Sequence, residues 1–264
     1  MPLQPPDGDG PHAAGDYAVG DVASHIAEER RRISLLGEVR EIVFGAQDGL
    51  VSTLAVVVTV AAATNDRLAI LIAGLASAVA GVFSMAAGEY LGSKSQAEIF
   101  DRQIADERDE VEHRPAEAEA EVAYLFQEEG LPPDDAQEVA KILARHPTSM
   151  LATMVSKELG LTYAEQLDTE GSPFRGALIM GGVFAVGGII PIAPFLFTNG
   201  MPAIVWSAAL TGIALFGMGA VKSRWTGRSW LTSGLEVFSL AMIAGGAGYV
   251  FGSVLPTLLG FAVP

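Results

Sequence analysis

Residues 42–64 (IVFGAQDGLVSTLAVVVTVAAAT) form an apolar run that one carboxylate, Asp48, interrupts. As a helix this run is about 34 Å long, which exceeds the roughly 30 Å hydrocarbon core of a bilayer. The run therefore predicts a membrane-spanning helix. An acidic side chain at that depth costs about 3 kcal/mol and usually faces a bundle interior, a partner or a passing ion. Asp48 is thus a candidate functional residue, although a protonated aspartate that only bonds a neighbouring helix would also fit.

Four further apolar segments follow, and the mean hydropathy of the chain is +0.37. We therefore predict an all-α membrane protein with five transmembrane helices and a cytosolic helical domain inserted between the second and third spans. No proline occurs between the second span and Pro115, so that span is expected to continue outward as one helix. The predicted parts are a disordered tail (1–24), an amphipathic start with two spans (25–94), the acidic domain (95–170) and three spans (171–264).

The acidic charge is concentrated in one polar segment. The chain has a formal net charge of -15, and residues 98–170 contain 19 Asp and Glu against 6 Lys and Arg. Such a field attracts cations and repels nucleic acid, so no nucleic-acid partner is expected. The chain has no cysteine, which excludes thiolate metal sites and disulfides.

Basic residues predict the orientation in the membrane. Arginines 30–32 and Arg40 precede the first span, and with the N-terminus inside, every Lys and Arg except Arg67 lies on the cytosolic side. The N-terminus and the acidic domain are therefore expected in the cytosol, and the membrane would be the plasma membrane if the protein is bacterial. We find no nucleophile with a base at a workable spacing and no phosphate loop, so an enzyme is not expected.

Several polar side chains are predicted at similar depths. Counting inward from the cytosolic ends places Asp48, Met85 and Glu236 roughly 10 Å below the surface, with Glu89 one turn nearer the cytosol and Glu41 near the mouth. This layer favours an ion pathway over separate structural anchors. Carboxylates combined with a thioether suit Fe²⁺ or Mn²⁺ better than Mg²⁺ or Zn²⁺.

The polar segment offers a second set of ligands. Helical spacing places Glu107 and Glu110 on one helix face, and it places Glu117 and Glu121 on a face of the next helix. On the last helix of the segment, the same spacing aligns Met150, Met154 and Glu158 in a stripe. Together they could form a cation site. The alternative is a solvated acidic helix with i,i+4 ion pairs such as Glu98/Arg102 and Glu110/Arg114, and a methionine stripe that belongs to a core.

Four motifs resemble the vacuolar iron transporter family: FGAQDGLVST, SMAAGEYLGSKSQAE, KELGL and GGVFAVGGIIPIAPF. The resemblance implies a five-span homodimer that moves Fe²⁺, and often Mn²⁺, out of the cytosol in exchange for protons, between the first spans of the two subunits. It also implies that Asp48 and Met85 belong to the pathway. The implied ligands of the cytosolic domain are Glu107, Glu110, Glu121, Met154 and Glu158.

Two positions depart from the family pattern. Ala118 stands where the family commonly has a glutamate, so Glu117 or Glu119 would have to substitute, and Val155 stands where a second methionine often occurs. Both departures concern the number of ions that the acidic domain holds.

The sequence thus predicts a proton-coupled Fe²⁺ or Mn²⁺ transporter with no permanently bound cofactor. Its expected partners are divalent metal ions, protons, membrane lipid and a second copy of the chain. The alternative is a membrane-anchored metal sensor or buffer that binds metal without transporting it.

Overall fold

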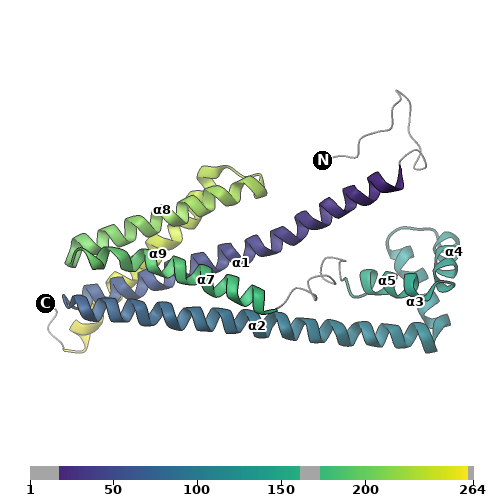
Figure 1. The fold of residues 1–264 in the computed structure, drawn as a ribbon, viewed down its shortest axis with the longest axis horizontal. Helices are drawn as coiled ribbons and strands as arrows, with labels where there is room; N and C mark the ends of the chain where they lie inside the picture. The colour runs from purple at the N-terminus through teal and green to yellow at the C-terminus, as the bar shows by residue number, and fades with distance from the viewer. Residues whose placement is uncertain (1–17, 161–172, 261–264) are drawn as a thin grey trace, which may run out of the picture. The chain divides into compact units, whose positions relative to one another are not determined.

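The computed structural model describes residues 18–160 and 173–260, and every regular element in these ranges is helical (Figure 1). The helices are α1 (Val19–Ala63), α2 (Arg67–His113), α3 (Pro115–Glu128), α4 (Pro133–Ala144), α5 (Pro147–Lys157), α7 (Pro173–Ile192), the short 3₁₀ helix η2 (Ala193–Leu196), α8 (Gly200–Thr226) and α9 (Trp230–Leu258).

Five of these helices contain segments long and apolar enough to cross a membrane, as predicted. They are Val39–Ala63 in α1, Arg67–His113, Pro173–Leu196, Gly200–Arg224 and Trp230–Leu258. The second one continues without a break for 47 residues, which confirms the long helix that ends before Pro115. The helix α1 begins at Val19, so residues 19–24 are helical and do not belong to a disordered tail. This stretch contains no proline, unlike the residues before it, and residues 1–17 lie outside the described part of the chain.

The chain divides into two compact units. One combines Met1–Gly37 with Gly92–Ser172, and the other combines Glu38–Leu91 with Pro173–Pro264. We call the second unit the apolar bundle and the described residues 92–160 of the first unit the insert. The predicted acidic domain, 95–170, has nearly the same limits as the segment Gly92–Ser172.

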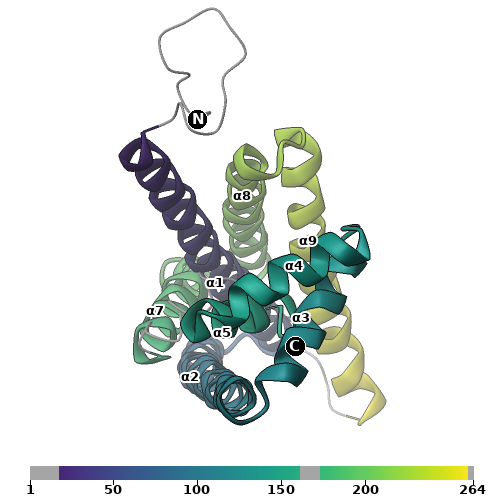
Figure 2. The same ribbon diagram turned by 90° about the vertical axis from the view of Figure 1, so that its right-hand side faces the viewer.

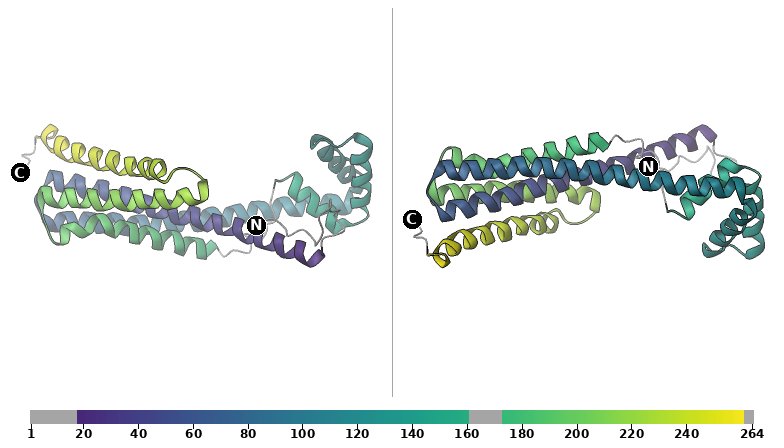
Figure 3. Two further views of the ribbon diagram at one scale, coloured as in Figure 1. Left: turned by 90° about the horizontal axis from the view of Figure 1, so that it is seen from above. Right: turned by 90° about the horizontal axis from the view of Figure 1, so that it is seen from below.

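Side chains from all five apolar helices form the core of the apolar bundle. Leu54 and Val57 of α1 and Leu215 of α8 are fully buried in it, together with Phe195 of η2. The helices α8 and α9 pack along each other (Figure 3). Their close approach requires a glycine, because a Cβ on Gly219 would overlap the Ser233 carbonyl oxygen.

A smaller core holds the insert together. The helices α3, α4 and α5 lie next to one another (Figure 2), and each begins with a proline at its first turn. Gly130, with φ of 101°, ends the α3 segment, and the Leu131 N–H donates to the Phe126 carbonyl at 3.1 Å. The buried residues of this core are Ala118, Val122, Ala123, Ala140, Met150 and Met154.

Candidate functional site

Four glutamates of the insert lie close together in pairs. Glu107 and Glu110 lie on α2, Glu121 lies on α3, and Glu158 directly follows α5. The carboxyl groups of Glu107 and Glu158 share a hydrogen bond, and so do those of Glu121 and Glu110. The structure therefore brings together predicted ligands that the sequence places on three separate helices.

Two oxygen atoms of this cluster receive no hydrogen bond from any group outside the acid pairs. They are Glu107 Oε2 and Glu110 Oε1, and both are buried. A buried carboxylate oxygen without a partner is unfavourable, because it has lost its hydration and gained nothing in exchange. Such atoms need a proton or a cation.

Burial and mutual repulsion raise the pKa values of the cluster. Burial and the charges of Glu158 and Glu110 raise the pKa of Glu107 to about 7. Burial, together with a hydrogen bond to Glu110, raises the pKa of Glu121 to about 7. Burial also raises the pKa of Glu158, and the charge of Glu110 adds to this effect. Near neutral pH the cluster can therefore hold protons or release them.

The described residues do not contain three or more His, Asp or Glu side chains already arranged to hold a metal ion. The physical reason is that like-charged carboxylates repel one another, and a shared proton favours pairs over larger groups. The sequence predicts a single inward-facing set from three helices, whereas the structure forms two acid pairs.

The two methionines of the predicted stripe are core residues in this structure. Met150 is 1% exposed and Met154 is 0% exposed, and both pack in the small core of the insert. This agrees with the core interpretation of the stripe. A ligand role for either thioether stays a prediction.

Ala118 and its two neighbouring glutamates, which were expected to substitute for a carboxylate at that position, have different surroundings. Ala118 is fully buried in the core of the insert. Glu117 is half exposed, and its Oε2 atom accepts a hydrogen bond from Arg114 Nη1 at 2.8 Å. Glu119 is half-buried.

Sequence reasoning missed two cations that hold these helices. Arg114 Nη2 lies 3.1 Å from Glu110 Oε2, a spacing recognised as an i,i+4 pair but not as part of a site. Lys157 forms an ion pair with Glu129 and lies 4.3 Å from the centre of the Phe126 ring, so it joins the end of α5 to the end of α3. Another predicted pair was wrong, since Arg102 pairs with Asp106 and Glu98 with Lys94.

The apolar bundle contains the second group of candidates, beginning with Asp48. This half-buried residue lies on α1 between Gly45 and Gly49. A Cβ on Gly45 would lie 3.0 Å from the Met180 carbonyl oxygen, and one on Gly49 would overlap the Phe184 carbonyl oxygen. The two glycines therefore bring α7 against α1 immediately beside Asp48.

Glu41 and Glu89 converge from two helices of the bundle. A Cβ on Gly176 of α7 would lie 3.4 Å from Glu89 Oε1 and 3.7 Å from Glu41 Oε2, so both carboxylates lie near one point. Met85 lies one turn before Glu89 on α2 and is half-buried.

Glu236 lies elsewhere on the bundle surface. It is on α9, where Ser233, Gly234, Val237 and Ala241 form the buried side. Its exposed carboxylate accepts a hydrogen bond from Arg228 Nη1 at 3.2 Å. Counting residues along a helix therefore does not give the direction of this side chain, and the depth of Glu236 in the membrane stays a prediction.

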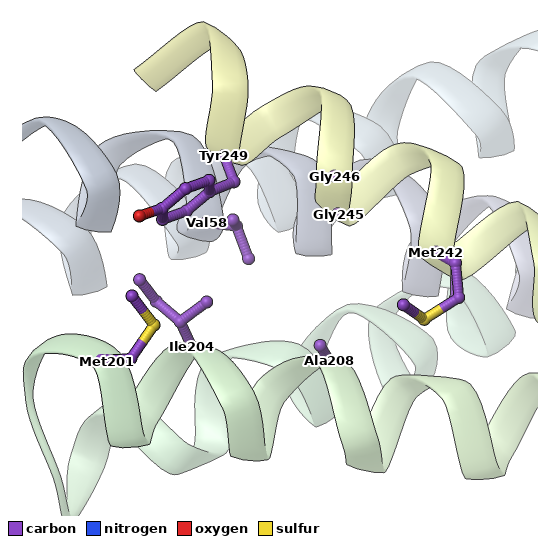
Figure 4. Close-up of a pocket in the computed structure, with 9 residues that line it drawn as sticks. Val58, Met201, Ile204, Ala208, Met242, Gly245, Gly246 and Tyr249 are labelled. Carbon is purple, nitrogen blue, oxygen red and sulfur yellow. The ribbon is translucent and has the colours of Figure 1, made fainter. Parts of the chain in front are cut away.

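A cavity of about 340 Å³ lies between α8 and α9, with Val58 of α1 contributing to its wall. In Figure 4, Met201 and Ile204 face Tyr249 across it. Its lining contains no charged residue, so this cavity does not resemble a binding site for a divalent cation.

Comparison with known proteins identifies relatives over most of the chain. The sequence profile of the VIT family matches residues 39–253. Vacuolar iron transporter 1 of Arabidopsis thaliana is 32% identical over 82% of this chain and 86% of its own length. Vacuolar iron transporter 2 of Oryza sativa subsp. japonica is 32% identical over 84% of this chain and 93% of its own length. Vacuolar iron transporter 1 of the same plant is 29% identical over 95% of this chain and 98% of its own length.

Proposed function

This chain belongs to the VIT family, and on that premise we propose that it moves Fe²⁺ or Mn²⁺ across a membrane in exchange for protons. Its five apolar helices and its transporter relatives support a multi-pass membrane protein and metal ion transport. We propose from the family resemblance that transport runs out of the cytosol. The basic residues predict only that the N-terminus and the insert face the cytosol.

The buried and unpaired oxygens of Glu107 and Glu110 are the observation that carries this proposal. A divalent cation would satisfy both atoms and would replace repulsion between carboxylates with attraction. We propose that Glu107, Glu110, Glu121 and Glu158 capture the ion on the cytosolic side. Metal binding would bring the two acid pairs together into one set of ligands.

Proton displacement at the capture step follows from the same carboxyl groups. A group with a pKa of about 7, such as Glu107 or Glu121, is partly protonated at neutral pH. Since a metal ion binds the deprotonated form, each ion that enters displaces protons. The cluster can therefore alternate between a protonated and a metal-bound state.

We propose that the ion then passes Glu41 and Glu89 and reaches Asp48 and Met85 in the apolar bundle. A carboxylate at membrane depth is costly unless it serves an ion, a proton or a partner helix. The glycine contacts with α7 hold the Asp48 segment of α1 in place. Glu236 is left outside this path because it pairs with Arg228 on the exposed side of α9.

A homodimer with the pathway between the first spans of its subunits completes the proposal. This arrangement comes from the family resemblance. In a bacterium the membrane would be the plasma membrane.

The test is metal flux in proteoliposomes that contain the purified full chain. Fe²⁺, Mn²⁺, Co²⁺ and Zn²⁺ are added with and without a pH gradient. We expect Fe²⁺ and Mn²⁺ flux that the gradient accelerates, and we expect Asp48→Ala to abolish it while the protein stays folded. The control is Asp66→Asn, which removes an exposed acid but keeps the oxygen that accepts from the Leu68 N–H. Flux from Asp48→Ala equal to that of the unaltered protein would refute the role of Asp48.

The same experiment separates transport from the alternative. A membrane-anchored sensor or buffer would bind metal through the glutamate cluster of the insert, which is the observation that favours it, but it would show no flux. Metal binding by the purified protein with no flux for any of the four ions would therefore establish the alternative.

A further inference from the structure

Arg114 connects two helices of the insert at the edge of the glutamate cluster. It lies between α2 and α3, and its guanidinium group contacts a carboxylate on each helix. Nη2 lies 3.1 Å from Glu110 Oε2 and Nη1 lies 2.8 Å from Glu117 Oε2. The planar guanidinium group is suited to such a bridge, because its donors have a fixed relative geometry.

The two oxygens of Glu110 consequently have different surroundings. Oε2 faces Arg114, whereas Oε1 is buried and receives no hydrogen bond from an N–H donor. The side chain as a whole is 13% exposed, so it has little room to exchange the two atoms by rotation. Glu110 therefore presents one oxygen to the cluster.

We propose that Arg114 determines the ion specificity of the insert by restricting Glu110 to one metal–oxygen bond. This inference rests on the proposed capture of metal by the glutamate cluster. Ca²⁺ takes six to eight oxygen ligands and uses carboxylates that bind through both oxygens, whereas smaller divalent ions take fewer ligands. A glutamate whose second oxygen is held by Arg114 thus disfavours Ca²⁺ relative to Mn²⁺ or Fe²⁺.

Arg114 can fill this role without stabilising the fold through its ion pairs. The Arg114 side chain is 51% exposed, and exposed ion pairs contribute little to stability. What matters is which carboxylate oxygen is available to the metal. A ratio of affinities tests this point, because general changes in charge or stability affect both ions alike.

The experiment compares Arg114→Gln with Arg102→Gln in the full-length, detergent-solubilised protein. Both changes remove one positive charge. Arg114→Gln removes the ion pairs with Glu110 and Glu117, whereas Arg102→Gln on α2 removes a pair with the exposed Asp106. Both are made in an Asp48→Asn background, so that the proposed membrane pathway adds little to the signal. Dissociation constants for Mn²⁺ and Ca²⁺ are measured by isothermal titration calorimetry.

We expect Arg114→Gln to shift the affinity ratio toward Ca²⁺ by about tenfold, since Glu110 can then bind through both oxygens. Arg102→Gln should leave the ratio unchanged. Glu117→Gln, which loosens Arg114 but leaves the four clustered glutamates intact, should cause a smaller shift in the same direction. If Arg114→Gln does not fold, the affinity ratio of Glu117→Gln tests the role of Arg114 instead.

The role of Arg114 is overturned if Arg114→Gln binds Mn²⁺ normally and leaves the affinity ratio unchanged. The same result in Glu117→Gln overturns it if Arg114→Gln does not fold. Neither result affects the proposed capture of metal by the glutamate cluster. A shift of the ratio toward Mn²⁺ also overturns the role of Arg114. If the parent protein binds no Mn²⁺, the proposed capture step fails and this inference fails with it.

Discussion

Glu107 and Glu158 belong to different helical segments of the insert, and their carboxyl groups share a hydrogen bond. Such a bond requires one of the two acids to be protonated, and burial is the largest cause that raises the pKa of each. The pair therefore joins a proton-binding group to a proposed metal ligand. The consequences for pH, stability and transport can be measured.

The first prediction concerns the pH dependence of metal binding. Glu107 and Glu121 each have a pKa of about 7, so they bind protons that a metal ion must displace. Between pH 8 and pH 6, Mn²⁺ affinity should fall by about tenfold for each displaced proton. Calorimetric titration in buffers with different ionisation enthalpies measures both the affinity and the number of protons released. A pH-independent affinity would contradict the proton-metal exchange.

The second prediction concerns stability without metal. The pKa of Glu107 is raised from 4.5 to about 7, so the folded insert binds more protons than the unfolded one between these values. Its stability should therefore be highest below about pH 5 and should decrease as the pH rises toward 8. Hydrogen exchange of the α5 amides in the presence of a chelator measures this change.

Glu107→Gln should reduce the loss of stability between about pH 5 and pH 8, because it eliminates a buried group that is unfavourable when charged. The matched control is Glu138→Gln, at an exposed position on α4. Equal effects of the two substitutions at pH 8 would argue against a buried acid at residue 107.

The third prediction concerns Lys157, which holds the end of α5 on α3. Its ammonium group pairs with Glu129 and lies 4.3 Å from the centre of the Phe126 ring. Lys157→Met should destabilise the insert by about 1 kcal/mol and weaken Mn²⁺ binding, since Glu158 is the next residue. Lys141→Met, at an exposed position on α4, serves as the control. The two variants should differ in Mn²⁺ titrations, and identical affinities would exclude a positioning role.

The fourth prediction concerns the contact between α1 and α7. A Cβ on Gly49 would overlap the Phe184 carbonyl oxygen, so Gly49→Ala should push α7 away from the Asp48 segment at a cost of about 1–3 kcal/mol. We expect a loss of metal flux in proteoliposomes. Gly182→Ala on α7 is the control, because nothing lies within 4 Å of its added methyl group. Normal flux from Gly49→Ala would show that this close approach is not required.

Local properties of the sequence were sufficient to predict the five long apolar helices. Five apolar runs predicted the five long helices, and the distance to the next proline predicted the length of α2. The prolines at 115, 133 and 147 mark the first turns of three helices in the insert. Length, apolar content and proline position act within a few residues, so they can be read without knowing which helices are neighbours.

The tertiary structure decided where the side chains on those helices point. Counting along the chain gave a predicted depth for Glu236 but not its pairing with Arg228. Spacing predicted the methionine stripe but left open whether it binds metal or belongs to a core, and Met154 is buried in the core. The pairing of Glu107 with Glu158 and the bridge from Arg114 to Glu110 and Glu117 depend on how separate helices pack. Successive side chains point about 100° apart around a helix axis. Which partner a side chain meets therefore depends on which helix packs against that side.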